Sequence, residues 1–315
     1  MKRLNPTRRA FVKTLSVLPF AGALPSSMLA APARVKALRP ICLFSKHLQW
    51  MSYRQLAETA AEIGFDGIDL TVRPGGHVDP SKVEIQLTEA VVEGRKAGLP
   101  VDTITTNITD ADDPQSEPIV KACSILGIKH YRMGAIRYDE SIPPEVFLEQ
   151  QRVRFEKLAA LNAKYQVLGS YQNHAGVQLG SPVWDLWELL KTAYPAHLGC
   201  QYDIRHAVVE GGRSWPLGLK LLRNYIKTTV IKDFRWEETA EGWRIRNTPL
   251  GEGMVDFPAY FSLIKKYDIA GPVSLHFEYP LPTADIGFAA RKRETMAVMR
   301  KDLETLRGYM RDAAF

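Results

Sequence analysis

Eight short apolar runs alternate with longer amphipathic stretches from residue 40 onward, and this rhythm constrains the fold more than any other feature. The apolar runs are residues 40–44, 67–72, 100–105, 130–133, 166–172, 198–203, 228–232 and 272–277. The amphipathic stretches are residues 53–63, 83–97, 116–126, 145–165, 184–192, 216–225, 257–267 and 291–310. Strands that alternate with helices indicate a parallel sheet, and eight such units indicate a closed barrel. We therefore predict an α/β fold, a single (β/α)₈ TIM barrel, over residues 34–315.

Local signals at the ends of the helical stretches agree with this prediction. Ser52 and Asp256 stand directly before amphipathic stretches and are suited to cap helix N-termini. Gly98 and Gly127 follow two other stretches and are suited to end helices. A doubly wound open sheet is the alternative fold, but no G-x-G-x-x-G sequence follows the first apolar run.

The first 33 residues have the order of an export signal. A twin-arginine motif occupies residues 7–13, an apolar stretch covers residues 15–29, and small residues follow. We predict a signal peptide over residues 1–33, recognition by the twin-arginine export machinery, and a periplasmic location. The alternative is a basic start to a cytosolic domain.

The charge of the chain lies mostly in this N-terminal segment. The formal net charge is +6, and residues 1–33 hold five basic and no acidic side chains, which leaves +1 for the rest. Without a basic stripe we expect no nucleic-acid partner. The apolar stretch is broken by Pro19 and Pro25, so we expect no membrane span. Three cysteines cannot all pair internally, and Cys42 and Cys200 lie in apolar runs typical of buried strands.

Polar side chains gather where the apolar runs end. Active sites of (β/α)₈ barrels lie at the carboxyl ends of the strands. A divalent metal prefers the oxygen and nitrogen ligands that such side chains supply. The strand-end groups are Ser45-Lys46-His47, Arg73 to His77, Asn107, Arg132 or Arg137, Gln172 to Gly176, Asp203 to His206, Lys232-Asp233 and His276-Phe277-Glu278.

Several of these groups form motifs in a characteristic order. They are Q-N-H-A-G at residues 172–176, D-x-x-H at residues 203–206, K-D at residues 232–233, the glycine turn at residues 251–253, and Glu278. With these motifs the chain resembles the xylose-isomerase-like barrel superfamily of sugar isomerases and epimerases, from about residue 40 to residue 280. The resemblance implies a carbohydrate substrate and proton abstraction next to a carbonyl group.

The resemblance also implies a divalent metal, Mn²⁺, Mg²⁺ or Zn²⁺. Asp203 and Glu278 match two of the family's usual ligands, whereas Gln172 stands in place of a glutamate and Val230 in place of a histidine. A glutamine carbonyl oxygen is still a ligand for Mg²⁺ or Mn²⁺. With His206 as a further candidate, the predicted metal ligands are Gln172, Asp203, His206 and Glu278.

The same substitution bears on the mechanism. Two carboxylates acting on opposite faces of the substrate are disfavoured, because the Gln172 amide takes up no proton at neutral pH. We predict Glu278 as a base, with Lys232 or His174 as the second catalytic group. The predicted substrate-binding residues are Arg73, Trp236, Glu252 and His276.

These features predict an exported sugar isomerase- or epimerase-like enzyme for a non-phosphorylated carbohydrate, since no phosphate-binding glycine loop is found. Isomerisation and elimination from a keto-glycoside are both open outcomes. The alternative is a non-catalytic sugar-binding protein on a degraded isomerase scaffold, suggested by Gln172 and Val230. Asp203 has a structural alternative as the cap of the following turn, and Lys232 has one as a bridge to Asp203 or Glu278. A nuclease related to endonuclease IV is disfavoured because the chain is poor in histidine.

Overall fold

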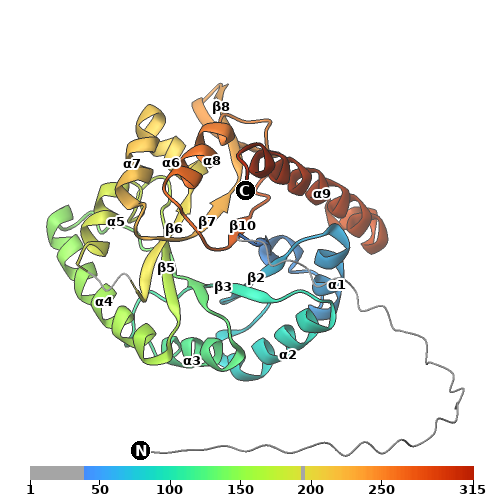
Figure 1. Ribbon diagram of the computed structural model, residues 1–315, viewed down its shortest axis with the longest axis horizontal. Helices are drawn as coiled ribbons and strands as arrows, with labels where there is room; N and C mark the ends of the chain where they lie inside the picture. Colours follow the sequence, from blue (N-terminus) through green and yellow to red (C-terminus); the bar gives the residue numbers. More distant parts are fainter. Residues whose placement is uncertain (1–38, 193–195) are drawn as a thin grey trace, which may run out of the picture. The chain divides into compact units, whose positions relative to one another are not determined.

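Eight parallel strands close into a barrel in the computed structural model, which describes residues 39–192 and 196–315 (Figure 1). The predicted signal peptide lies outside the described residues. Around the barrel the strand order is β1-β10-β7-β6-β5-β4-β3-β2. The predicted (β/α)₈ TIM barrel is therefore confirmed. The barrel strands are β1 (Ile41–Phe44), β2 (Gly67–Val72), β3 (Val101–Thr106), β4 (His130–Arg132), β5 (Leu168–Gln172), β6 (Leu198–Asp203), β7 (Ile226–Ile231) and β10 (Val273–Leu275).

Helices surround the barrel, and eight of them match the predicted helical stretches (Figure 1). Ser52 forms a capping box with Gln55 at the start of α1, and Asp256 accepts a hydrogen bond from the backbone N–H of Ala259 in α8. Gly127 ends α3 in the left-handed conformation, with φ of 79°. The matching helices are α1 (Tyr53–Ile63), α2 (Val83–Lys96), α3 (Ser116–Leu126), α4 (Pro144–Tyr165), α5 (Val183–Leu190), α7 (Trp215–Leu222), α8 (Phe257–Lys266) and α9 (Phe288–Asp312).

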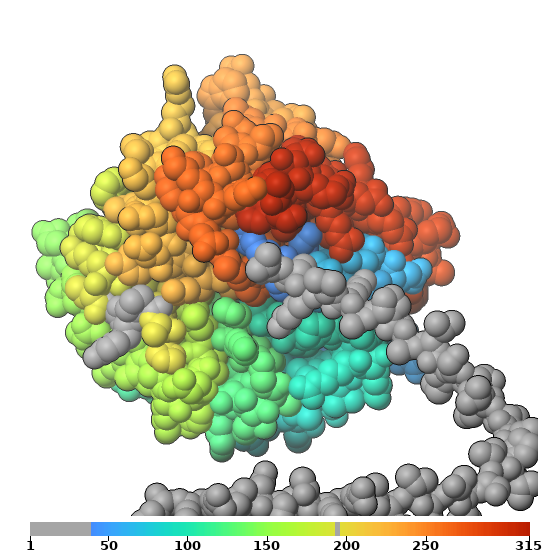
Figure 2. All heavy atoms as spheres, in the orientation of Figure 1, coloured from blue at the N-terminus to red at the C-terminus, as the bar shows by residue number. Residues whose placement is uncertain are grey.

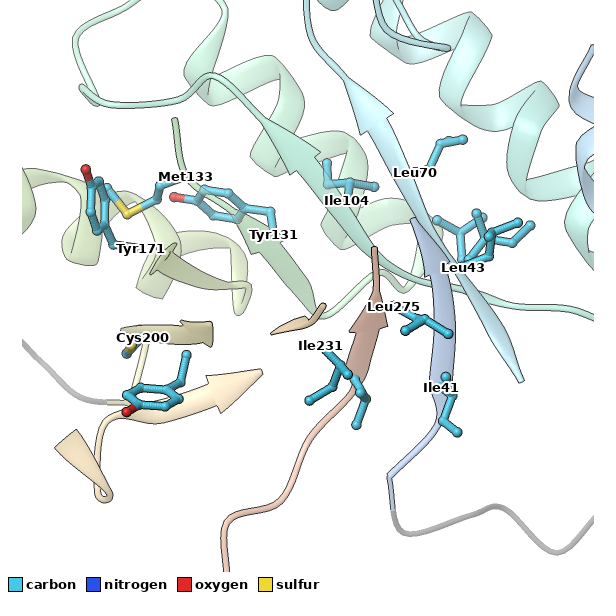
Figure 3. Packing of buried hydrophobic residues seen from close by; sticks show 14 of the residues in the cluster. Ile41, Leu43, Leu70, Ile104, Tyr131, Met133, Tyr171, Cys200, Ile231 and Leu275 are labelled. Carbon is cyan, nitrogen blue, oxygen red and sulfur yellow. The ribbon is translucent and has the colours of Figure 1, made fainter. Parts of the chain in front are cut away.

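The strands carry apolar side chains into both the barrel interior and the layer beneath the helices, as expected for parallel strands that are covered on both faces. Leu43 on β1 and Ile231 on β7 are both register partners of Leu275 on β10, and all three are fully buried. Figure 3 shows these side chains packed together near the strands that bear them. The cysteines Cys42, Cys123 and Cys200 are buried free thiols.

The first and last helices of the described chain, α1 and α9, lie side by side. Arg307 on α9 donates a hydrogen bond of 2.6 Å to the backbone carbonyl of Gly64, which follows α1. Figure 2 shows the red surface of α9 next to the blue surface of the first barrel elements. No helix within residues 39–192 and 196–315 is long and apolar enough to cross a membrane.

Two larger elements were not predicted from the sequence. Helix α6 (Ile204–Gly211) begins directly after β6, and an antiparallel hairpin of β8 (Asp233–Thr239) and β9 (Gly242–Thr248) follows β7. Asp233 anchors the hairpin, because its carboxylate accepts backbone hydrogen bonds from Phe234 and from the 251–255 turn. Short 3₁₀ helices complete the described chain at Ser45–Leu48, Pro80–Lys82, Gly212–Ser214 and Ala284–Ile286.

Candidate active site

A cavity of about 430 Å³ lies at the carboxyl ends of the barrel strands. It contains most of the residues predicted for the site, while Asp203 lies in the wall beneath, bonded to two of the lining side chains. The lining residues are Phe44, Lys46, Arg73, Asn107, Arg132, Ala135, Gln172, His174, Arg205, His206, Lys232, Asn247, His276 and Glu278.

Asp203 is the fully buried last residue of β6, and both of its carboxylate oxygens have partners. Oδ1 accepts a hydrogen bond of 3.1 Å from the backbone N–H of His206 and so caps α6. Oδ2 accepts from Gln172 Nε2 at 2.7 Å and lies 3.0 Å from Lys232 Nζ. Burial disfavours the charge, but Lys232 and the neighbouring histidines outweigh it and hold the pKa of Asp203 well below its usual range. Asp203 is therefore an ionised anchor.

Lys232 directly follows β7 and places its ammonium group between two elements of the site. Its Nζ lies 3.0 Å from Asp203 Oδ2 and 2.9 Å from His206 Nε2. Burial lowers the pKa of Lys232, and the Asp203 carboxylate opposes that shift. The bridge from Lys232 to Asp203 that we considered from the sequence is present.

Gln172 ends β5 and uses both ends of its amide. Its Nε2 donates to Asp203, and its Oε1 accepts a hydrogen bond of 2.7 Å from Arg132 at the end of β4. Oε1, the atom of the Gln172 side-chain amide that is suited to bind a metal, thus faces the guanidinium group of Arg132.

The ligands implied by the family resemblance do not form a site that fits a divalent metal. Val230 contributes only buried apolar surface. No group of three or more His, Cys, Asp or Glu side chains in the described part of the chain is arranged to hold a metal ion. A dication at the Gln172 and Asp203 oxygens would stand beside Arg132 and Lys232, which repel it strongly at such short range. Gln172, Asp203 and His206 lie close together, but Glu278 contacts Lys46 and His276 instead, and the oxygens of Gln172 and Asp203 already bind cationic or amide groups.

His174 lies two residues after β5 and lines the cavity. One hydrogen bond defines its tautomer. Its Nδ1 lies 2.8 Å from the backbone carbonyl of Gln172, which only accepts hydrogen bonds, so Nδ1 carries the proton. Nε2 is then the unprotonated nitrogen. Burial and the positive charges of Arg132 and Lys232 lower the pKa of His174 to about 4. His174 is therefore a neutral imidazole that is able to accept a proton.

Glu278 follows β10 and is the carboxylate that lines the cavity. Its Oε2 accepts a hydrogen bond of 2.9 Å from Lys46, and its Oε1 lies 3.8 Å from His276 Nδ1. Burial disfavours the charge, but His276, Lys232 and Lys46 together hold the pKa of Glu278 well below its usual range. Glu278 is therefore ionised and has no proton to donate.

His276 is held in place from beneath by a chain of hydrogen bonds. Its Nε2 lies 3.2 Å from Ser274 Oγ, which donates to Asp69 Oδ2 at 2.6 Å. Its ring stacks on Phe44 with a centroid separation of 4.0 Å. His276 thus lines the cavity on a rigid support, and its Nδ1 is buried without a hydrogen-bond partner among the described residues.

Two predicted substrate-binding residues lie outside the cavity formed by the described residues. Trp236 is on the hairpin, where it packs beside Phe234 and is 39% exposed. Glu252 is exposed and pairs with Lys301 at 2.7 Å. Trp236 lies on the unpredicted hairpin, whereas the turn that carries Glu252 is bonded to Asp233 and leaves the Glu252 side chain paired with Lys301 on α9.

Other lining residues were not predicted as site residues. Lys46, Arg132 and Arg205 all stand in the strand-end groups, so their positions contained a signal that their residue type alone did not resolve. Asn247 had no such signal, because it reaches the cavity from β9.

Comparison with known proteins identifies the family. Residues 57–307 match the model of the xylose isomerase-like TIM barrel family, and the chain belongs to this family. No match was found among the curated proteins.

Solved structures with the same fold share little sequence with the chain. A 3-keto-D-glucoside 4-epimerase from E. coli has 16% identity and a TM-score of 0.59, covering 83% of this chain and 99% of its own. A probable 3-DHS dehydratase from Bacillus anthracis has 20% identity and a TM-score of 0.61, covering 83% and 97%. A D-allulose 3-epimerase from Methylomonas sp., in complex with D-allulose, has 14% identity and a TM-score of 0.63, covering 86% of this chain and 98% of its own. At these identities the likeness establishes the fold.

Proposed function

We propose that the protein is a carbohydrate-modifying enzyme that removes a proton from the carbon next to a carbonyl group, with His174 as the base. The observation that carries this proposal is the tautomer of His174, whose hydrogen bond to the Gln172 carbonyl leaves Nε2 unprotonated in a cavity rich in cations. The epimerases and the dehydratase that share the fold support it.

The proton and the electron pair both have a destination in this cavity. The C–H proton passes to His174 Nε2, and the electron pair moves to the carbonyl oxygen to form an enolate. An ammonium group has three N–H donors, and Lys232 has contacts with Asp203 and His206, so one donor remains for the substrate oxygen. A cation at that oxygen stabilises the charge that develops there.

The protonation states favour one base over two. Inversion at a single carbon needs an acid on the opposite face, and ionised Glu278 has no proton to supply. His174 can instead return its proton to the former carbonyl carbon while the hydroxyl proton on the deprotonated carbon passes to the enolate oxygen, which completes an isomerisation. Alternatively, the enolate re-forms the carbonyl group, the C–O bond to a leaving group on the next carbon breaks, and His174 gives its proton to that leaving group, which completes an elimination. We assign Glu278 to binding substrate hydroxyl groups. We assign no step to a divalent metal, because Gln172 and Asp203 already bind Arg132 and Lys232.

The experiment is solvent deuterium exchange into keto sugars, followed by proton NMR in D₂O. We expect exchange next to the carbonyl that a chelator does not slow. His174→Gln should slow it by about 10²- to 10⁴-fold, the range for loss of a general base. His197→Gln is the matched control, since His197 precedes β6 at the opposite end of the barrel.

A second function, binding without catalysis, is favoured by the completely partnered Asp203 and Gln172. It predicts that keto sugars bind while no exchange occurs in the parent protein. Unchanged exchange in His174→Gln would instead show that another group is the base.

We also propose export to the periplasm by the twin-arginine route, on the strength of the motif at residues 7–13. Replacing Arg8 and Arg9 with lysine should retain the protein in the cytoplasm, as measured by cell fractionation. Unaltered periplasmic recovery of that variant would exclude the route.

A further inference from the structure

The positive charges in the cavity outnumber the negative ones. Lys46 pairs with Glu278, and Lys232 pairs with Asp203. Arg73, Arg132 and Arg205 also line the cavity, and none of them forms an ion pair with a carboxylate of the described residues. Three guanidinium groups thus have no carboxylate in direct contact among the described residues.

Arg132 makes the imbalance most unfavourable, because its side chain is only 9% exposed. Its one side-chain hydrogen bond goes to the neutral amide of Gln172, and its Nε has no partner among the described residues. Burial lowers the pKa of Arg132 to about 10, so the group stays charged at neutral pH. An unpaired buried charge destabilises a protein by several kcal/mol.

Arg73 lies against the same aromatic ring as Arg132. The Cζ atoms of both side chains are 5.9 Å from the centroid of Phe44. The opposing positive charge of Arg73 contributes to the lowered pKa of Arg132, after burial and in opposition to Asp69. Two like charges held together beside one ring are a site for an anion.

We propose that the substrate is a sugar acid whose carboxylate binds to Arg132 and Arg73, an assignment of substrate class that rests on the proposed function. Guanidinium groups are planar and match a carboxylate with paired hydrogen bonds. The carbonyl group of the same molecule then lies toward His174 and Lys232, which line the cavity with the arginines.

The surrounding backbone favours a carboxylate over a phosphoryl group. Barrels that bind phosphate commonly use backbone N–H groups of the last strand loops. Here the N–H groups of Gly251 and Gly253 donate to Asp233, and that of Gly76 donates to the carbonyl of Arg73. These glycine turns are therefore already saturated.

The test compares D-fructose, D-fructuronate and D-fructose 6-phosphate, which differ only at C6, by isothermal calorimetry on the purified protein. We expect fructuronate to bind at least about tenfold more tightly than fructose, the ratio that corresponds to about 1.4 kcal/mol. Arg132→Met and Arg73→Met should each remove that preference, because they weaken fructuronate binding much more than fructose binding. Arg137→Met is the matched control, since Arg137 pairs with Glu140 on the surface.

Other results overturn the assignment. Equal affinity for fructose and fructuronate would exclude a carboxylate site, and tighter binding of fructose 6-phosphate would assign the arginines to a phosphoryl group. The deuterium-exchange assay separates this inference from the proposed function. Fructuronate that binds without exchange contradicts the function alone, and exchange that is confined to neutral keto sugars contradicts the carboxylate site alone.

Discussion

The two sides of the cavity treat their charges in opposite ways. On the side built by β5, β6 and β7, Lys232 is bonded to the Asp203 carboxylate, and Asp203 also holds Gln172 and the start of α6. On the side built by β2 and β4, Arg73 and Arg132 lie beside Phe44 without any described carboxylate partner. We call these the paired side and the unpaired side.

The difference separates what holds the site together from what holds a ligand. Charges on the paired side satisfy one another, so this side keeps its geometry in the empty protein. Charges on the unpaired side have no carboxylate in direct contact. Asp69 offsets them from a distance, and an anion from solution could pair with them directly. Burying the charges of the unpaired side without a direct partner is unfavourable in the folded protein. A bound anion relieves this unfavourable free energy and a neutral ligand does not, so the site selects for an anion.

The largest expected effect comes from removing one cation from each side of the cavity, in two separate variants. Lys232→Met leaves the buried Asp203 carboxylate without its counter-charge, and we expect the free energy of unfolding to fall by about 3–5 kcal/mol. Arg132→Met removes a cation of similar burial that has no such partner, and we expect stability to stay level or to rise. Urea unfolding at pH 7 without ligand measures both. Equal losses in the two variants would show that the sides do not differ.

The titration of His174 sharpens the comparison further. Arg132→Met should raise the pKa of His174 from about 4 towards its ordinary value of 6.5, because one of the opposing charges is gone. His77 is the control, since its pKa of about 4 is lowered by burial and not by these cations. Two-dimensional NMR of the imidazole groups, recorded over a range of pH, measures the pKa of both histidines. An unmoved pKa of His174 would mean that burial and Lys232 set it without Arg132.

The same shift predicts how stability depends on pH. The pKa of His174 is lower in the folded protein than in the unfolded chain, so the unfolded chain binds more protons between about pH 6.5 and pH 4. Stability should therefore decrease as the pH falls through this range. Arg132→Met should make the decrease shallower, which urea titrations at several pH values will measure.

The smallest expected effect concerns Arg205, which has a neutral partner. Asn247 accepts a hydrogen bond of 2.7 Å from Arg205, and its side-chain nitrogen lies 3.3 Å from the backbone carbonyl of Glu278. Asn247→Ala should lower the free energy of unfolding by about 1 kcal/mol, the usual value of one such hydrogen bond. It should leave the preference for a carboxylate intact. Loss of that preference would move the anion site to Arg205.

The barrel was predictable because its signals are local. Each apolar run and each amphipathic stretch is contained in a few successive residues, and Ser52 and Asp256 cap helices through neighbours three residues away. The convergence of Gln172, His174, His206, Lys232 and Glu278 followed from the fold, because all of them stand at carboxyl ends of parallel strands.

The missed features depend on contacts between distant residues. The hairpin β8–β9 is the exception. It is mostly exposed, but Phe234 and Trp236 in β8 and Trp243 and Ile245 in β9 alternate with polar residues, a signal of strands that our prediction did not use. The hairpin itself accounts for the position of Trp236, which lies on β8. Whether Asp203 meets a metal or Lys232, and whether Arg132 meets a carboxylate, is decided by side-chain placement that residue type and spacing do not specify.

The hairpin has a consequence for how members of this family can diverge. Strands β7 and β10 pair directly with each other, so the barrel closes without β8 and β9. Yet Asn247 on β9 reaches the cavity wall. The hairpin is thus an insertion that is held to the barrel through Asp233 and supplies part of the cavity wall. Replacing this one insertion can change which ligand binds, while the eight barrel strands stay the same.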